Sequence, residues 1–204
     1  MIRRQHHGPE PLVLWGARVQ LRTLVDADFD AWHEVRWRCR DWLIQWEPRP
    51  SGAPYPAEDR PAFHSRCALR ERERQMQTGF SFGTFVDGQL RGELTLSSIL
   101  RGPFQSASIG YWIDQAVAGN SYTPEAVVVV LRYAFEVLNL HRVEISIIPR
   151  NAPSLRVAEK LGLRMEGVTV GYLEIDGRWE DHARFAITID EWRDRRDELA
   201  AAWL

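Results

Sequence analysis

The sequence predicts a mixed α+β fold, with one mostly antiparallel, twisted sheet of about seven strands and helices on both of its faces. Three observations support this prediction. Several segments alternate apolar and polar residues, as half-buried strands do. Two Asp-Gly pairs, Asp87-Gly88 and Asp176-Gly177, separate such segments and are typical of two-residue hairpin turns. Between these hairpins, two helices with clear start signals enclose a single strand.

The composition indicates one globular domain over residues 1–204. The chain has 204 residues, 45% of them hydrophobic, and a formal charge of -2, so it can bury a core and gives no broad electrostatic case for nucleic acid or membranes. No apolar run is long enough to span a bilayer. Cys39 and Cys67 lack metal or redox spacing, which favours a cytoplasmic location and no metal. Residues 1–11 are expected to form a flexible arm.

The first third of the chain predicts one strand and two helices. Residues 19–22 alternate as a strand does, and Asp26 is expected to cap a helix that ends near residue 38. Residues 41–48 form an aromatic segment that we interpret as a loop. Residues 61–78 predict a charged helix whose inward side chains are Phe63, Cys67, Leu69 and Met76.

The middle of the chain predicts an antiparallel meander. Residues 80–86 and 89–97 are strands joined by Asp87-Gly88. A connecting loop over residues 99–106 then leads into a strand that carries Tyr111 and Trp112.

A small polar loop, residues 118–122, is followed at once by a helix start. Thr123 is predicted as the N-cap, with Pro124 and Glu125 in the first turn. The helix that follows, to about residue 138, is apolar on nearly every face, which predicts a core helix. Backbone N–H groups at such a helix start lack intrahelical partners and can bind an anion such as a pyrophosphate. The alternative is an ordinary strand-to-helix loop.

The last part of the chain predicts a strand, a helix and a hairpin. Residues 143–147 alternate as a half-buried strand. Asn151 is the expected N-cap of a helix that Gly162 ends. Residues 165–175 and 179–189 form the closing hairpin, and Asp190 is expected to cap a short final helix.

Several of these motifs together resemble the GNAT superfamily of acetyl-CoA-dependent N-acetyltransferases, and most of all its ribosomal-protein-alanine (RimJ/RimL) type. The motifs are Gly110-Tyr111-Trp112, the loop AGNSYTPEA, LHRVE at 140–144, Asn151-Ala-Pro-Ser154 and AEKLGL at 158–163. The resemblance implies the GNAT fold, with a parallel strand pair splayed at the acetyl-CoA site. It implies acetyl-CoA as cosubstrate, bound by Trp112, Ile113, Ala118, Gly119, Asn120, Ser121, Tyr122, Thr123, Asn151 and Ser154.

The phosphate loop departs from the usual family pattern, which is Gln or Arg, two residues, Gly, one residue, then Gly or Ala. The matching residues here are Ala118, Ser121 and Thr123. Backbone N–H donors do not depend on the side chain, so the loop can still hold a pyrophosphate if Ser121 adopts the required backbone angles.

For the chemistry, the resemblance implies that Ser154 gives a proton to the departing sulfur and that Asn151 bonds the pantetheine or orders water; Ser154 could equally be a helix-capping residue. Glu93 is a candidate base, because burial on a central strand would raise its pKa. The alternative for Glu93 is an outward-facing strand position. Other candidates for the base are Glu174, Asp181, His182 or water.

The acceptor is expected to be a primary amine. In the resembling family, the early helical region shapes the acceptor site, so Trp46 and Glu47 are candidate substrate-binding residues; the alternative is plain loop packing. The function that the resemblance implies is transfer of an acetyl group to the N-terminal α-amino group of a protein, by a monomer or homodimer. The alternatives are a small-molecule amine acetyltransferase and a non-catalytic protein that binds acetyl-CoA as a sensor or partner.

Overall fold

The computed structural model of the chain describes residues 12–54 and 56–204, so the arm predicted for residues 1–11 lies outside the described residues. The strands are β1 (Val13–Trp15), β2 (Val19–Arg22), β3 (Phe80–Val86), β4 (Gln89–Leu100), β5 (Ser106–Ile113), β6 (Arg142–Ile147), β7 (Arg164–Ile175) and β8 (Arg178–Thr188). The α-helices are α1 (Phe29–Arg38), α2 (Arg40–Ile44), α3 (Arg60–Gln75), α4 (Tyr122–Arg132), α5 (Ala152–Lys160) and α6 (Ile189–Trp203). A π-helical turn, Tyr133–Val137, extends α4.

The strands form one sheet in the order β1-β2-β3-β4-β5-β6-β8-β7. All neighbouring strands are antiparallel except β5 and β6, which are parallel. The predicted α+β fold is therefore confirmed, with eight strands in place of about seven. The additional strand is β1, which has only three residues and is too short to show an alternating pattern.

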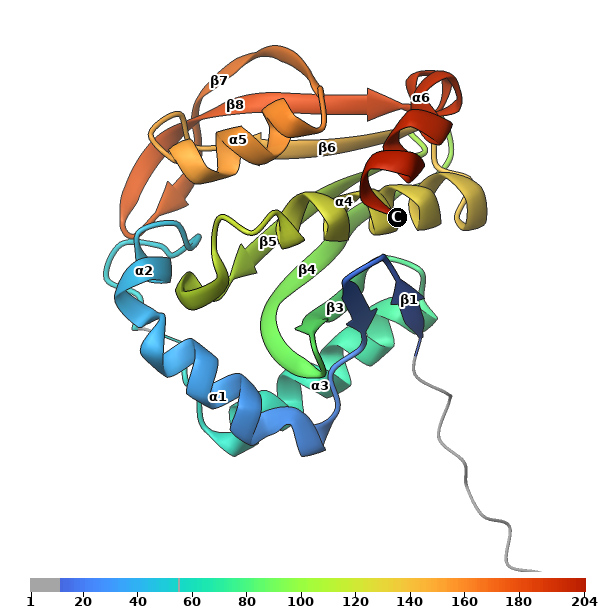
Figure 1. The fold of residues 1–204 in the computed structure, drawn as a ribbon. Helices are drawn as coiled ribbons and strands as arrows, with labels where there is room; N and C mark the ends of the chain where they lie inside the picture. Colours follow the sequence, from blue (N-terminus) through green and yellow to red (C-terminus); the bar gives the residue numbers. More distant parts are fainter. Residues whose placement is uncertain (1–11, 55) are drawn as a thin grey trace, which may run out of the picture.

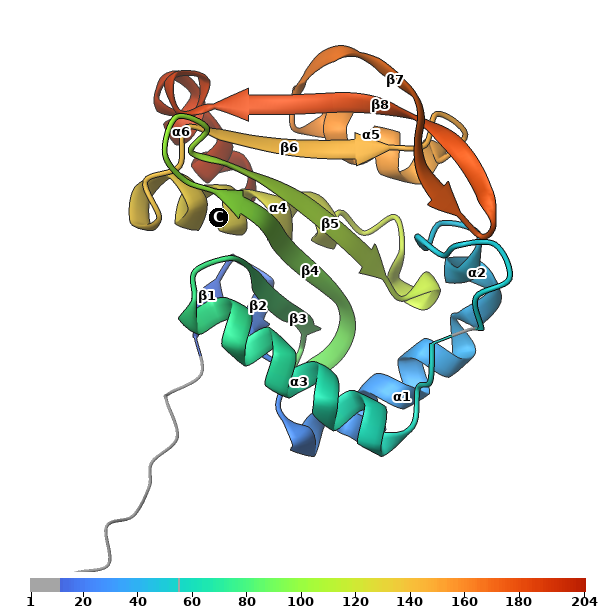
Figure 2. The ribbon, with the colours of Figure 1, turned by 180° about the vertical axis from the view of Figure 1, so that it is seen from behind.

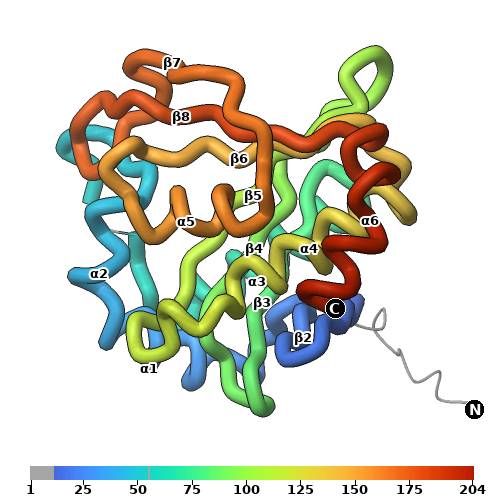
Figure 3. Tube along the Cα trace, turned by 45° about the horizontal axis from the view of Figure 1, so that its top comes forward, coloured from blue at the N-terminus to red at the C-terminus, as the bar shows by residue number. Residues whose placement is uncertain are grey.

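Helices cover both faces of the sheet. In Figure 1, α4 lies in front of the sheet and α3 lies behind it, and Figure 2 shows the reverse view. On one face, α1 packs on β4 and α3 packs on β3; on the other, α4 packs on β2, β4 and β5. Helix α6 runs beside α4 (Figure 3). The predicted arrangement of helices on both faces is confirmed.

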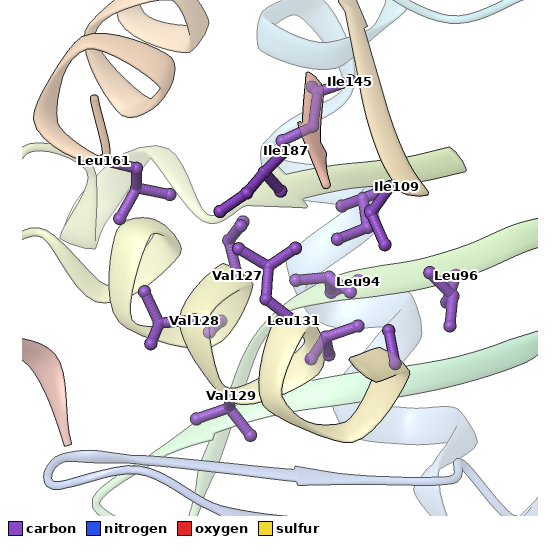
Figure 4. Close-up of a cluster of buried hydrophobic side chains, with 14 of the residues drawn as sticks. Leu94, Leu96, Ile109, Val127, Val128, Val129, Leu131, Ile145, Leu161 and Ile187 are labelled. Carbon is purple, nitrogen blue, oxygen red and sulfur yellow. The ribbon is translucent and has the colours of Figure 1, made fainter. Parts of the chain in front are cut away.

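Helix α4 is the centre of the hydrophobic core. Val127, Val128 and Val130 have no exposed surface, and they pack among side chains of β4, β5, β6 and β8 (Figure 4). Burying side chains of this size stabilises the fold by about 1.5–3 kcal/mol each. The prediction of a core helix is confirmed, and α4 thereby holds the loop before it at a fixed place beside the sheet.

The sheet opens between β5 and β6. The parallel pairing joins only Ser106–Ser108 to Arg142–Glu144. Beyond it, β5 stays paired with β4 as far as Ile113, and β6 stays paired with β8 as far as Ile147. Residues 109–113 of β5 therefore have a strand partner on one side only, and the opening lies next to the start of α4.

Three predicted N-caps are displaced from the observed helix starts. A 3₁₀ turn at Asp26–Asp28 precedes α1, and Asp28 accepts the Val25 N–H. Ser121, not Thr123, precedes the first residue of α4. Thr188, not Asp190, caps α6 through a capping box with Glu191, and α6 spans 15 residues rather than a short segment. The Thr188-x-x-Glu191 pattern is the signal that identifies this start.

Two further predictions in the first third of the chain are wrong. Residues 40–44 form the short helix α2, which overlaps the segment 41–48 that we interpret as a loop from its sequence. Leu69 and Met76 are exposed (54% and 72%), whereas Phe63 is buried. Leu69 lies about 200° around the helix from Cys67, and Met76 lies beyond the last residue of α3, so neither faces the sheet.

Candidate active site

The loop before α4 has the backbone shape of an anion-binding site. Ser121 has φ +65° and ψ +20°, in the left-handed region, and Gly119 has φ +87°. Such turns direct successive backbone N–H groups towards one point. The N–H groups of Tyr122 and Thr123 are in the first turn of α4, where no intrahelical acceptor exists. Ser121 thus adopts the left-handed conformation that glycine normally supplies.

A buried carboxylate anchors this loop to β2. The Glu125 side chain is 1% exposed. Its Oε1 accepts the N–H groups of Arg18 (2.5 Å) and Val19 (2.9 Å), and its Oε2 accepts Arg18 Nε at 2.8 Å. Arg18 Nη1 also donates to the carbonyl of Asn120 at 3.1 Å. This network fixes the orientation of the loop without using the loop's own N–H groups.

Lys160, near the end of α5, adds a positive charge to the same loop. Its Nζ donates to Ser121 Oγ at 2.6 Å. The family pattern has a Gln or Arg at the position of Ala118, and here Lys160, from a different helix, places a positive charge beside the same loop. Sequence reasoning missed this residue, because a lysine near a helix end has an ordinary explanation in the helix dipole.

The start of α5 carries two polar side chains beside β5. Asn151 Oδ1 accepts the Ser154 N–H at 3.1 Å, which confirms Asn151 as the N-cap. Ser154 Oγ lies 2.8 Å from the hydroxyl of Tyr111, on the opened stretch of β5. Burial raises the pKa of Tyr111 to about 12. The sequence predicts that Tyr111 lies on this strand, but it carries no signal that Tyr111 belongs to the site.

The end of β5 is held by a second buried carboxylate, Asp114. Its side chain has no exposed surface, and it forms ion pairs with Arg38 and Arg91 and accepts the Ala116 N–H at 3.0 Å. Burial alone would raise its pKa, but these bonds outweigh burial and lower the pKa to about 2. Trp112, two residues earlier, lies on the same side of the sheet as Asp114, next to α1 and opposite Tyr111, with Arg36 over its ring at 5.5 Å.

Glu93 is buried on β4, but in an ion pair. It is 5% exposed, accepts Trp32 Nε1 at 2.7 Å and pairs with Arg66. Burial acts to raise the pKa of Glu93, and the charge of Arg66 prevails, so the pKa is lowered. The expected rise is therefore wrong. Glu93 does lie on the face opposite Leu94, but α1 and α3 cover that face, so the solvent-facing alternative is wrong too.

The other candidate bases also have local partners. Glu174 Oε1 accepts the Ser51 N–H at 2.6 Å, and Asp181 Oδ1 accepts the Gly171 N–H at 2.8 Å. His182 is buried, and its Nδ1 lies 3.0 Å from the Glu180 carbonyl. Because a carbonyl can only accept, Nδ1 is the donor in this contact.

Trp46 lies next to the turn that begins α5. The Arg150 guanidinium is 4.7 Å above the Trp46 ring, and Arg150 Nη2 donates to the Gln45 carbonyl at 3.3 Å. Arg150 directly precedes the N-cap Asn151. The structure therefore brings Trp46 close to the predicted catalytic turn, although about 100 residues separate them in sequence.

Residues 46–51 are hydrogen-bonded to residues 174–177 at the tip of the β7–β8 hairpin. We call these two segments together the acceptor wall. The Arg49 N–H donates to the Glu174 carbonyl (2.9 Å), and the Gly177 N–H donates to the Arg49 carbonyl (3.0 Å). The Asp176 N–H donates to the Glu47 carbonyl (3.3 Å). The Glu47 side chain pairs with Arg36, which also pairs with Glu58 at 2.7 Å.

A cavity of about 320 Å³ lies on the α3 side of the sheet, lined among others by Phe63, Cys67 and Glu93. Tyr111 packs against the main core, on the side of α4 and α5. Glu93 and Tyr111 thus point to opposite faces. Within residues 12–54 and 56–204, no cluster of three or more His, Cys, Asp or Glu side chains is arranged to hold a metal. In the same residues, no helix is long and apolar enough to cross a membrane.

The family follows from a comparison with known proteins. Residues 18–164 match the model of the acetyltransferase (GNAT) domain. The chain belongs to the GNAT family. The opened β5–β6 pair agrees with the GNAT fold, and the enzyme is an acetyl-CoA-dependent N-acetyltransferase of the RimJ/RimL type.

Known relatives support this assignment over most of the chain. This protein is 30% identical over 170 residues to the [Ribosomal protein uS5]-alanine N-acetyltransferase of Escherichia coli, and the match covers 81% of this chain and 86% of that protein. The structure of Mycobacterium smegmatis RimJ in complex with CoA-disulfide superposes with a TM-score of 0.88 at 30% identity, covering 95% of both chains. A Bacillus subtilis relative, named "Probable N-acetyltransferase YjcK", is 43% identical over 115 residues, 56% of this chain and 64% of that one.

Proposed function

We propose that this enzyme acetylates the N-terminal α-amino group of a protein. The observation that carries the proposal is that each candidate base already has a hydrogen-bond partner. Glu93 has a lowered pKa beside Arg66, the Glu174 and Asp181 carboxylates accept main-chain N–H groups, and His182 is buried with its Nδ1 on the Glu180 carbonyl. An acceptor that is already partly neutral suits such a site. With a pKa of 7.7–8.0, about one α-amine in ten is neutral at pH 7, against fewer than about one lysine amine in a thousand.

The relatives agree with an α-amine acceptor. The Escherichia coli relative acetylates an alanine of a ribosomal protein, as its name states, and a structural relative is named RimJ. On this chain, the acceptor wall stands beside the turn that carries Asn151 and Ser154, and it offers an aromatic surface through Trp46. An extended peptide terminus can lie against such a wall with its amine near Ser154.

The residues present also fit acetyl-CoA. The loop 118–123 offers first-turn N–H groups and Lys160 offers a positive charge, both suited to the pyrophosphate. The unpaired edge of β5, ending at Trp112-Ile113, leaves main-chain groups for the amides of the pantetheine arm. Asn151 and Ser154 then lie beside the β5 edge, where the thioester end of the pantetheine arm would be. The loop thus retains the means to bind the cofactor despite its departures from the family pattern.

The transfer needs an attacking amine, a breaking C–S bond and a proton for the sulfur. The neutral amine attacks the acetyl carbon, and the electron pair of the C–S bond moves to the sulfur. Ser154 donates its hydroxyl proton to that sulfur, and water carries the proton lost by the amine nitrogen back to Ser154. Holding amine and thioester together supplies much of the rate, and Ser154 supplies a general-acid contribution.

A peptide pair tests the acceptor. One peptide begins with a free alanine and contains one lysine, and the other is identical except for a formyl group on its N-terminus. With acetyl-CoA, we expect thiol release and a mass gain on the alanine of the first peptide only, located by fragmentation mass spectrometry. Acetylation of the lysine in both peptides would overturn the α-amine assignment. Thiol release only with small amines, or none with any amine, would favour the two alternative functions.

A further inference from the structure

The Tyr111 and Ser154 hydroxyls form a pair in which only one proton can lie between the oxygens. The Tyr111 Oη to Ser154 Oγ distance is 2.8 Å, and either atom could donate. If Tyr111 donates, the Ser154 hydroxyl proton is free to form a hydrogen bond with another group. If Ser154 donates, its proton is occupied and the Tyr111 proton has only the Ser154 carbonyl, at 3.4 Å, as a described acceptor.

The surroundings favour Tyr111 as the donor. Burial keeps the phenol protonated at neutral pH, since its pKa is about 12. A phenol is more acidic than an alcohol and is therefore the better hydrogen-bond donor of the two. The competing bond to the Ser154 carbonyl is long, at 3.4 Å. The geometry and the chemistry thus both place the Tyr111 proton on the line to Ser154 Oγ.

We infer that Tyr111 is a positioning residue for the acetyl transfer: its hydroxyl donates to Ser154 Oγ and so leaves the serine proton directed at the departing sulfur. The inference rests on the proposed role of Ser154. As the C–S bond breaks and Ser154 gives its proton to sulfur, the Tyr111 bond stabilises the negative charge that grows on Oγ. The proton from the amine nitrogen then restores Ser154, and Tyr111 keeps its own proton throughout.

A double-mutant cycle tests this inference with whichever amine the enzyme acetylates. Tyr111→Phe should lower kcat about three- to ten-fold, the rate equivalent of one neutral hydrogen bond. The KM for acetyl-CoA should stay within about two-fold, because Tyr111 is not asked to bind it. In a Ser154→Ala background, Tyr111→Phe should cause no further loss, because its effect passes through Ser154.

The control is Tyr133→Phe, which removes the hydroxyl of another partly buried tyrosine whose ring packs edge-on against Phe80. It should leave kcat unchanged. Equal losses from Tyr111→Phe in both backgrounds, or no loss in either, would overturn the inference while leaving the proposed function intact. A Ser154→Ala enzyme with wild-type turnover would instead remove the role of Ser154, and the inference with it.

Discussion

The main-chain N–H of Val19 donates to Glu125 Oε1 at 2.9 Å, which joins the start of β2 to the first turn of α4 across more than 100 residues. The same carboxylate receives the Arg18 N–H and side chain. A Cβ at Gly16 would lie 2.7 Å from this Oε1, so any larger residue there would have to displace the bonded carboxylate. The position of the phosphate loop therefore depends on one buried acid.

Replacing this acid should weaken both the fold and cofactor binding. Glu125→Gln keeps the shape but offers an N–H group where Arg18 already donates, so the free energy of unfolding should fall by about 1.5–3 kcal/mol. The increase in melting temperature on adding CoA should also shrink. Urea unfolding and thermal shift measure the two effects. Glu159→Gln, at an exposed residue of α5, is the matched control and should change neither.

Substitutions at Ser121 should separate the backbone from the side chain. Ser121→Gly removes the cost of a left-handed residue and keeps the N–H groups, so CoA should raise the melting temperature about as much as in the wild type. Ser121→Val forces a β-branched residue into φ +65°, and the shift should be smaller. Both variants lose the Lys160 contact, which makes them controls for each other. A full shift with Ser121→Val would rule out this loop as the pyrophosphate site.

Ser154→Ala should lower turnover without much loss of cofactor affinity. The hydroxyl acts only as the C–S bond breaks, so kcat should fall ten-fold or more, near the low end of a general-acid contribution. The Kd for CoA, from calorimetry, should stay within about two-fold of the wild type. Ser65→Ala, at an exposed residue of α3, serves as the control. Unchanged turnover would show that Ser154 is not the proton donor and has only a structural role in the first turn of α5.

The acceptor wall gives a kinetic prediction. Trp46→Ala removes the aromatic surface beside Arg150, and Glu47→Gln removes the negative charge that pairs with Arg36 at this wall. Each should raise the KM for the peptide acceptor while leaving the KM for acetyl-CoA nearly unchanged, and Trp46→Ala should do so more strongly. Trp15→Ala, at an exposed residue of β1, is the control. If both variants keep wild-type acceptor kinetics, residues 46 and 47 only pack the loop.

Asp114 gives a pH prediction. Its pKa is about 2 in the folded protein and about 3.9 in an unfolded chain, so its contribution to stability is complete above pH 4 and is lost as the pH falls towards 2. The contribution is about 2.5 kcal/mol. In urea unfolding, Asp114→Asn should lose about this amount at pH 7 and show a weaker dependence on pH between 5 and 3. Asp190→Asn, whose side chain is 74% exposed, should follow the wild type.

Local signals in the sequence predicted most of the fold. Asp87-Gly88 and Asp176-Gly177 have positive φ at both residues, as two-residue hairpin turns require. The apolar helix after Pro124 is buried, and Asn151 caps α5. These features depend on residues close together in the chain, which a single sequence shows directly.

The site was harder to predict, because its contacts join distant segments. The lowered pKa of Glu93 depends on Arg66, which approaches from α3, and the contact of Lys160 with Ser121 joins α5 to the loop before α4. On β5, Tyr111 occupies a position where the alternating pattern predicts a core residue. Its hydroxyl contacts Ser154 because α5 packs next to this strand. The spacing of residues in the sequence does not predict contacts between segments that are so far apart.

The acceptor wall has a consequence for how this enzyme could diverge. Three main-chain hydrogen bonds join Glu47 and Arg49 to residues 174–177, and main-chain groups do not depend on which side chains the residues carry. Under the proposed role of this wall in binding the acceptor, surface substitutions in residues 46–51 or at the hairpin tip change which amine is accepted while the two segments stay joined. The α4–α5 half, which holds the phosphate loop and Ser154, need not change. The same proposal implies that substrate range can change by point mutation while the proposed cofactor site stays intact.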